Sequence, residues 1–225
     1  RSVSVISTGM GTDNIDIVFN ELDALFNLEL NTGKPLKSPT PLTFIRLGTS
    51  GTIQANIDLD SLIVAEAAIG FDNLMHYYEP SMCEHPIAVS LHSKLGMSKN
   101  LNHPYYIDGD SVLVDDCLKL GMSKGIIVTN PGFYAPQGRH LRIKNILPYD
   151  LNEFLHFNYK DSIITNFDME TSGIYGLSHV MGHRAISISA ILANRFHSTF
   201  SNQADKTVFN MIEKVTNAIK NGFFL

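Results

Sequence analysis

The hydrophobic positions along the chain follow two periods. Short apolar runs rich in β-branched residues are typical of buried strands, and they occur at 3–7, 43–47, 61–69, 125–129, 162–165 and 185–193. Apolar residues at helical spacing predict helices at 15–26, 110–120, 150–157, 171–181 and 205–221. Strands that alternate with helices indicate one α/β domain around a largely buried sheet, with no internal repeat and no linker.

The residues between these runs indicate where the elements end. Gly121 and Gly182 follow two of the predicted helices, as glycines at helix ends often do, and Asp150 suits the N-cap of a third. Residues 27–41 carry three prolines and indicate a surface loop, while residues 72–86 indicate an irregular polar excursion. One apolar face of the last helix predicts its packing side: Val208, Met211, Ile212, Val215 and Ile219.

Composition is that of an ordered globular protein. Charged residues make up 17% and apolar residues 44% of the 225 residues, which favours a packed core over disorder. The net charge of −5 provides no general attraction for nucleic acid or for an anionic membrane. No apolar run is long enough to span a membrane and no signal peptide is visible, so we expect a cytoplasmic protein. Cys83 and Cys117 stand outside any CxxC pair, which predicts two reduced thiols.

Four polar clusters carry the candidate chemistry. Three of them follow predicted strands, at 46–51, 137–139 and 194–195, and the fourth, at 168–170, precedes a predicted helix. Ligands of open α/β sheets bind beyond the carboxyl ends of the strands. We therefore expect the four clusters to converge on one pocket.

The first cluster reads Arg-Leu-Gly-Thr-Ser-Gly. We expect a turn here, in which successive backbone N–H groups form a concavity for an anion and Arg46 adds bidentate contacts to phosphate oxygens. An ordinary glycine-rich turn with a surface arginine explains this segment equally well when it is taken alone.

Motifs of several other enzyme classes are missing from the sequence. There is no Walker A pattern, no HExxH and no GxSxG nucleophile elbow, and neither cysteine has a recognisable base partner. Gly9 and Gly11 lack the third glycine of a dinucleotide fingerprint, and His179 and His183 lack an obvious third metal ligand. These absences disfavour the common covalent hydrolases, zinc enzymes and dinucleotide-dependent enzymes.

Five blocks, taken in order, resemble the nucleoside phosphorylase family in its uridine phosphorylase branch. The blocks lie within residues 3–195 and read STGMGTDN, FIRLGTSGTIQ, GFYAPQGR, NFDMETSGIYGL and AISISAILANR. The resemblance implies a single three-layer α/β domain with a central mixed, partly barrel-like sheet flanked by helices. It also implies phosphorolysis in nucleoside salvage, in which uridine and the co-substrate inorganic phosphate give uracil and ribose 1-phosphate without a cofactor.

The resemblance assigns roles to residues of the four clusters. The phosphate-binding positions of the family correspond to Arg46, Gly48 and Thr49. The ribose-binding positions correspond to Thr49, Met169 and Glu170. The base-binding positions correspond to Ser50, Gly51, Phe133, Gln137, Arg139, Asp168, Leu192 and Arg195. The positions expected to act in catalysis are Arg46, Thr49, Arg139 and Glu170.

Chemical reasoning favours a pyrimidine base. Negative charge moves onto the base as the glycosidic bond breaks, so Arg139 and Arg195 can stabilise the transition state more than the ground state. Gln137 offers one donor and one acceptor to the amide edge of uracil. Purine-cleaving relatives place an Asp near the end of the late strand, where this chain has Ala-Asn-Arg at 193–195. A purine nucleoside phosphorylase and a non-catalytic nucleoside-binding relative are the alternatives.

The chain also departs from the family pattern. Asp168 stands where most relatives have Glu, and because its side chain is shorter we expect Glu170, not Asp168, to hold the ribose, with Asp168 as a support residue. We expect residues 1–225 to form one domain that lacks the family's N-terminal βα segment with its phosphate loop. Relatives bind a monovalent cation at a dimer interface, which makes Met10 and Asn14 candidate K⁺ ligands. We expect a homo-oligomer, either a dimer or a hexamer built from three dimers.

Overall fold

The computed structural model describes residues 2–97, 103–145, 147, 152–159 and 162–224. The longer strands are β3 (Thr43–Thr52), β4 (Leu62–Gly70), β5 (Tyr105–Asp108), β6 (Ser123–Thr129), β8 (Ser162–Asp168) and β9 (Arg184–Asn194). The helices are α1 (Thr12–Asn27), α2 (Pro86–Lys94), α3 (Ser111–Lys119), α4 (Asn152–Leu155), α5 (Thr171–Met181) and α6 (Ala204–Lys220). The short strands and 3₁₀ turns are β1 (Leu28–Glu29), β2 (Lys34–Pro35), β7 (Asn158–Tyr159), β10 (Thr199–Phe200), η1 (Leu74–His76), η2 (Pro80–Glu84) and η3 (Ala135–Gln137).

Five strands form a closed, barrel-like ring. β3 pairs in parallel with β9 and antiparallel with β8, while β6 runs parallel to both β8 and β4. β4 then pairs antiparallel with β9, between residues 62–64 and 188–190, and this pairing joins the two ends of the series. β5 extends the sheet beyond β4, and β10 folds back onto β9. The predicted α/β fold with a mixed, partly barrel-like sheet flanked by helices is confirmed.

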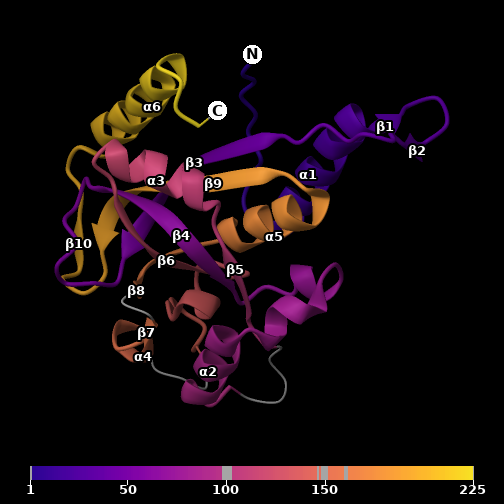
Figure 1. Ribbon diagram of the computed structural model, residues 1–225. Coiled ribbons are helices and arrows are strands. Elements are labelled where there is room, and N and C mark those ends of the chain that lie inside the picture. Colours follow the sequence, from indigo (N-terminus) through magenta and orange to yellow (C-terminus); the bar gives the residue numbers. More distant parts are fainter. Residues whose placement is uncertain (1, 98–102, 146, 148–151, 160–161, 225) are drawn as a thin grey trace.

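Three groups of buried side chains attach the helices to this sheet. Ile15 of α1 and Leu177 of α5 belong to one group, and Leu113 of α3 belongs to a second group that also takes in α6 and β9. Leu91 of α2 and Phe154 of α4 belong to the third. Figure 1 shows these helix pairs at three separate places around the sheet. The cavity described below lies among the strand ends and loops that the helices leave uncovered.

Local sequence explains where the helices begin and end. The Asp110 carboxylate accepts the Leu113 N–H at 3.0 Å and so caps the first turn of α3. Gly182 ends α5 with φ of +74°, and Gly121 follows α3 with φ of +79°, backbone values that favour glycine. Both predicted helix ends are confirmed. Cys83 and Cys117 are free thiols, as predicted.

Two predictions about the surroundings of the cavity are wrong. Residues 2–9 form no strand, and Val3 and Val5 are exposed by 65% and 96%. A β-branched run forms a strand only where a neighbouring strand accepts its hydrogen bonds, and no described strand pairs with this one. Residues 48–51 are not a turn, because β3 continues through them to Thr52 in parallel register with β9.

Smaller differences concern the periphery. Met211 and Val215 of α6 are buried as predicted, but Ile212 is 45% exposed, because the buried stripe of α6 is centred on the side that also carries Thr207. The predicted loop at 27–41 contains the short β1–β2 hairpin. The predicted N-cap Asp150 lies outside the described residues. α2 and β5 were not predicted, because aromatic and polar residues interrupt the periodicity between 86 and 108.

Within the part of the chain that the structure describes, no helix has both the length and the apolar character needed to cross a membrane.

Candidate functional site

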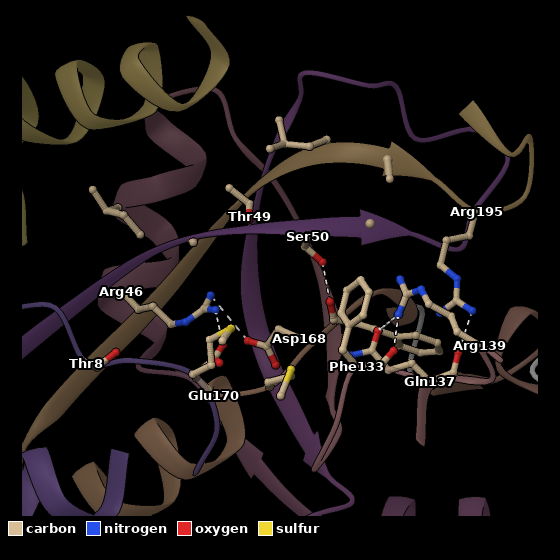
Figure 2. A pocket seen from close by; sticks show the side chains of 18 of the residues that line it. Thr8, Arg46, Thr49, Ser50, Phe133, Gln137, Arg139, Asp168, Glu170 and Arg195 are labelled. Atoms are coloured by element: carbon tan, nitrogen blue, oxygen red, sulfur yellow. Dashed lines mark hydrogen bonds and ion pairs between the residues drawn. The ribbon is translucent and has the colours of Figure 1, made fainter. Parts of the chain in front are cut away.

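The four polar clusters meet at one cavity of about 1000 Å³. The cavity is bordered by residues 6–10, the second half of β3, the ends of β8 and β9, and the loop that follows β6. Figure 2 shows Arg46 and Glu170 toward one end of it and Gln137, Arg139 and Arg195 toward the other. Of the residues singled out in the sequence, Asn14 does not line the cavity, whereas these do: Met10, Arg46, Gly48, Thr49, Ser50, Gly51, Phe133, Gln137, Arg139, Asp168, Met169, Glu170, Leu192 and Arg195.

Arg46 is held by two carboxylates. Its Nη2 lies 2.5 Å from Glu170 Oε2, and its Nη1 lies 3.5 Å from Asp168 Oδ2 and donates to Ser187 Oγ at 3.3 Å. The guanidinium passes over Gly48, where an added Cβ would stand only 2.3 Å from Nη1. Side chains two residues apart share one face of a strand. Gly48 therefore gives the arginine room to reach the carboxylates.

Glu170 connects three parts of the site. It is the residue before α5, and its side chain points back toward β3 and the N-terminal segment. Oε1 accepts the Gly11 N–H at 2.9 Å while Oε2 faces Arg46. Glu170 is only 7% exposed, and a carboxylate so buried is costly unless it is paired and hydrogen-bonded in this way.

Both oxygens of Asp168 are engaged by the protein. Oδ1 accepts from Thr129 Oγ1 at 2.7 Å, and Oδ2 accepts from the Thr171 N–H at 3.1 Å and from the Thr171 hydroxyl. The Thr171 hydroxyl in turn lies 2.7 Å from Ser187 Oγ, which Arg46 also contacts. This network fixes the end of β8, the start of α5 and the middle of β9 beneath the guanidinium.

Thr49 leaves β3 on the side opposite to Arg46, as the alternation of a strand requires and as Figure 2 shows. Both side chains nevertheless border the cavity. β9 pairs with β3 throughout, whereas β8 pairs with it only at Gly51 and Thr52. Along 46–50 the other edge of β3 therefore has no strand neighbour among the described residues. An open strand edge presents backbone N–H groups, so it can take the place of the turn that the sequence predicts.

Gln137 and Arg139 form a bonded pair in the loop after β6. Arg139 Nη1 donates to Gln137 Oε1 at 2.5 Å and to the Phe133 carbonyl at 2.8 Å. The guanidinium carbon of Arg139 lies 4.0 Å from the centre of the Phe133 ring, which is a cation–π contact. Gln137 is 2% exposed and Phe133 is 51% exposed. The loop thus presents an aromatic face beside a fixed polar edge.

Arg195 approaches the same loop from the end of β9. Its Nη2 donates to the Gln137 carbonyl at 2.7 Å, whereas its Nη1 is buried and has no hydrogen-bond partner among the described residues. Burial and the charge of Arg139 lower the pKa of Arg195 to about 10, and burial also lowers the pKa of Arg139. Neither arginine forms an ion pair with any residue that the structure describes. This end of the cavity therefore carries uncompensated positive charge.

Small groups form the wall between the two ends. Ser50 Oγ donates to the Phe167 carbonyl at 2.6 Å and accepts from Asn166 Nδ2 at 2.9 Å. Gly51 faces Ala193, where an added Cβ would lie 3.4 Å from the alanine Cβ. With Met169 and Leu192, these residues leave an uncharged stretch between the cations.

The candidate cation ligands bond to each other. The Asn14 amide donates to the Met10 carbonyl, so this carbonyl already has a partner. A group of three or more His, Cys, Asp or Glu side chains that could hold a metal ion is not found in the described part of the chain. The role of Met10 and Asn14 as K⁺ ligands stays a prediction.

Sequence reasoning missed several residues of the wall. Ser198 and Phe200, which follow β9, line the cavity, as do residues 6–9 and Phe167. The STGMG run at 7–11 belongs to a block that carries the family resemblance, and this signal could have placed it at the site. Ser198 and Phe200 follow the Asn-Arg cluster closely, but their sequence carries no motif.

The whole chain matches one family of known proteins. Residues 1–221 match the family model described as the phosphorylase superfamily. Uridine phosphorylase from Thermococcus kodakarensis is 28% identical over 207 residues, or 91% of this chain and 62% of that protein. The chain therefore spans less than two thirds of the length of this curated relative.

Two further comparisons differ in substrate. A DeoD-type purine nucleoside phosphorylase from Buchnera aphidicola is 24% identical over 85% of this chain and 63% of that protein. A solved structure of a Trypanosoma brucei nucleoside phosphorylase, described as showing uridine phosphorylase activity, has a TM-score of 0.82 and 24% identity. It covers 96% of this chain and 79% of that one, and at this identity the likeness shows the fold alone.

Proposed function

Because this chain belongs to the phosphorylase superfamily, we propose that it is a uridine phosphorylase, which transfers the ribosyl group of a pyrimidine nucleoside to inorganic phosphate. The observation that carries this proposal is the arrangement of charge along the cavity. One end holds an arginine whose partner is a buried glutamate. The other end holds a glutamine amide beside two arginines that form no ion pair with the residues the structure describes. An anionic nucleophile fits the first end, and a leaving group that gains negative charge fits the second.

At the first end, substrates exchange with an existing ion pair. Arg46 Nη2 lies 2.5 Å from Glu170 Oε2. A phosphate dianion replaces Glu170 as the hydrogen-bond partner of the Arg46 guanidinium. The remaining phosphate oxygens face Thr49 and the open edge of β3 at Gly48. The Glu170 oxygen that is released accepts hydrogen bonds from the ribose hydroxyls, while Met169 packs on the sugar. Asp168 keeps its contacts to Thr129 and supports this arrangement without touching the ribose.

At the second end, the base is held flat and read along one edge. Phe133 is exposed enough to stack on a pyrimidine ring, a contact worth about 1–3 kcal/mol for a base on an aromatic side chain. Gln137 matches the N–H and carbonyl edge of uracil with one donor and one acceptor. Arg195 Nη1 is buried, has no hydrogen-bond partner among the described residues and is available to a base oxygen.

The reaction follows from these placements. A phosphate oxygen attacks the anomeric carbon while the bond from that carbon to the base nitrogen breaks, and the electron pair of that bond passes to the base. The sugar carries positive charge in the transition state, which the adjacent phosphate stabilises. Arg139 and Arg195 meet the charge that develops on the base, so they bind the transition state more strongly than the ground state. The phosphate gives up its proton as the new carbon–oxygen bond forms, and the departing base takes up one proton, so uracil and ribose 1-phosphate are the products.

The details of β9 favour a pyrimidine over a purine. Residues 193–195 include no carboxylate, and the Asn194 side chain forms hydrogen bonds within the protein. Its Nδ2 donates to the carbonyls of Gln54 and Ile57 at 3.1 Å each, and its Oδ1 accepts the His197 N–H at 3.1 Å. Both N–H groups of Asn194 are therefore occupied, and an amide is not an acid that could protonate a purine nitrogen.

The partner in the proposed assembly is a second copy of this chain. The rim of the cavity is apolar and open, with Ile6, Phe133 and Phe200 exposed by 56%, 51% and 78%. An apolar rim of this kind is better covered than left in water. We expect the full-length protein to form at least a dimer, which light scattering would reveal.

Substrate competition tests the proposed activity. Full-length protein with saturating phosphate should release base from uridine at least about 100-fold more efficiently than from inosine, because a mismatched base leaves the buried polar edge unpaired. Equal cleavage of the two nucleosides would assign the protein to a broader or purine-directed activity. Binding of uridine without any cleavage would identify a non-catalytic relative.

A further inference from the structure

One aspartate holds the segment that follows β9. Asp60, in the loop between β3 and β4, accepts hydrogen bonds from Ser201 Oγ at 2.5 Å, Thr207 Oγ1 at 2.6 Å and Gln203 Nε2 at 3.0 Å. These donors lower the pKa of Asp60, Ser201 most strongly. Its backbone N–H also donates to the Ile191 carbonyl at 2.8 Å. A single residue thus ties the segment at 201–207 to the loop and to β9.

The backbone supports a specific role for this contact. Asp60 has φ of +66°. Ser198, three residues before the Asp60 partner Ser201, has φ of +54°, and we call residues 198–203 the held segment. Residues other than glycine seldom adopt such values, and they keep them only where the surrounding structure fixes them. The backbone of Asp60 is fixed by the three hydrogen bonds that its carboxylate accepts and by the bond from its N–H to the Ile191 carbonyl of β9.

The held segment forms part of the cavity wall. Arg195, Ser198 and Phe200 all line the cavity, and all three precede Ser201. Phe200 is 78% exposed, so little core packing fixes it. β10 pairs with β9 through two residue pairs only. Polar contacts must therefore hold this segment in place.

The same loop also holds the near end of the segment. Asn194 Nδ2 donates to the Gln54 and Ile57 carbonyls, and His197 Nε2 lies 3.0 Å from the Ala55 carbonyl. The loop at 54–60 therefore contacts the segment on both sides of Ser198 and Phe200. At the far side Asp60 provides the side-chain contacts, next to a backbone bond from the Ser201 N–H to the Leu192 carbonyl at 2.8 Å.

We propose that Asp60 is a positioning residue for the base end of the cavity. By fixing residues 198–203 it keeps Phe200 and Ser198 against the bound nucleoside, whereas Arg195 is held separately by its bond to the Gln137 carbonyl. Among the described residues the Asp60 side chain bonds to Ser201, Gln203 and Thr207 and not to Arg46 or Thr49, so we expect its loss to leave the phosphate end largely unchanged. The kinetic part of this inference rests on the proposed function.

Two variants of Asp60 and one control test the inference. Asp60→Gly removes all three acceptor contacts, and it should fold because glycine adopts this backbone conformation without strain. Asp60→Asn keeps one acceptor oxygen and tolerates the left-handed region. Asp58→Asn changes the charge of an exposed residue in the same loop and serves as the control.

The expected result is a selective effect. Asp60→Gly should raise the KM for uridine about three- to tenfold, while kcat and the KM for phosphate stay within about twofold. Asp60→Asn should restore part of the affinity, and Asp58→Asn should match the parent. A rise in both KM values together, or in neither, would overturn the positioning role.

Backbone hydrogen exchange of the ligand-free proteins gives a readout that needs no activity. Peptides covering 195–207 should exchange faster in Asp60→Gly than in the parent or in Asp58→Asn. Unchanged exchange overturns the proposal whatever the kinetics show. If the parent binds uridine but does not cleave it, calorimetry replaces KM: weaker binding in Asp60→Gly supports the inference while the proposed activity fails, and equal binding overturns it.

Discussion

The two ends of the cavity use arginine in opposite ways. At one end Arg46 stands on a strand with Glu170 at 2.5 Å and Asp168 at 3.5 Å. At the other end Arg139 and Arg195 have no ion pair among the described residues, and burial lowers the pKa of both. A compensated cation suits a ligand that is charged before it binds, because the ligand replaces the internal partner. Uncompensated cations suit a group that becomes charged during the reaction.

This difference matches the two substrates of a phosphorolysis. Phosphate enters as an anion, so its site can store a counter-charge until the anion arrives. The base enters neutral, as part of uridine, and gains negative charge as the glycosidic bond breaks. Its site therefore gains most from hydrogen-bond donors that are already in position and poorly satisfied in the ground state. The variants below separate the two ends, from the largest expected effect to the smallest.

Removal of Arg46 should have the largest effect. Arg46→Ala deletes the proposed phosphate ligand and leaves two buried carboxylates without their cation. We expect a loss of about 1,000-fold in kcat/KM and a lower melting temperature, since breaking a buried pair costs about 3–5 kcal/mol. Arg46→Lys, which keeps the charge but not the bidentate geometry, should recover stability more than activity. Retention of activity within tenfold in Arg46→Ala would remove Arg46 from the phosphate site.

Removal of Arg139 should reduce the rate constant rather than the affinity. We expect Arg139→Ala to lower kcat about 100- to 1,000-fold, because the lost donor acts on charge that grows as the bond breaks. Arg142→Ala is the matched control, since Arg142 is an exposed arginine of the same loop that does not line the cavity. Steady-state kinetics on both variants decide the matter. Equal small effects in the two would mean that Arg139 is only a surface residue.

A methyl group at Gly48 should act on the phosphate end alone. The new Cβ would stand 2.3 Å from Arg46 Nη1, so the guanidinium must move while the strand backbone stays. A displacement near 1 Å can cost about 100-fold, and we expect Gly48→Ala to raise the KM for phosphate about 10- to 100-fold. The KM for uridine should change much less, and the melting temperature little. A larger effect on uridine than on phosphate would contradict this separation of the two ends.

Loss of Gln137 should be the mildest change. Its hydrogen bonds to uracil are neutral and worth about 0.5–1.5 kcal/mol each, so Gln137→Ala should raise the KM for uridine about three- to tenfold per bond lost. Discrimination against inosine should relax at the same time. A variant that loses more activity than Arg139→Ala would reverse the order proposed here.

Much of the fold could be predicted from residue pattern. Alternating strand and helix periods, with Gly121 after α3 and Gly182 after α5, identify most elements, because these signals depend on local geometry. The residue pattern could not predict the closure of the ring, since the β4–β9 pairing joins residues more than 120 positions apart; the barrel-like character of the sheet was implied only by the family resemblance. The strand prediction at residues 3–7 is wrong for a related reason. The β-branched pattern is a local signal, but a strand also needs a neighbouring strand to accept its hydrogen bonds.

In the candidate site, too, sequence motifs identify individual residues but do not predict contacts between residues that are distant in sequence. The family resemblance assigns Arg46, Gln137, Arg139 and Glu170 to one site, and these residues line one cavity. It could not predict that Arg46 passes over Gly48, because that depends on where the carboxylates stand. Nor could it predict Asp60, whose partners come from a segment about 140 residues away.

The measurement that tests the central claim most directly is base release from uridine by the full-length protein, with and without phosphate. Ultraviolet detection of uracil and separate detection of ribose 1-phosphate follow both products. The charge arrangement predicts that uracil appears only when phosphate is present and in equal amount to ribose 1-phosphate. Uracil release at the same rate in phosphate-free buffer, with free ribose as the sugar product, would contradict it.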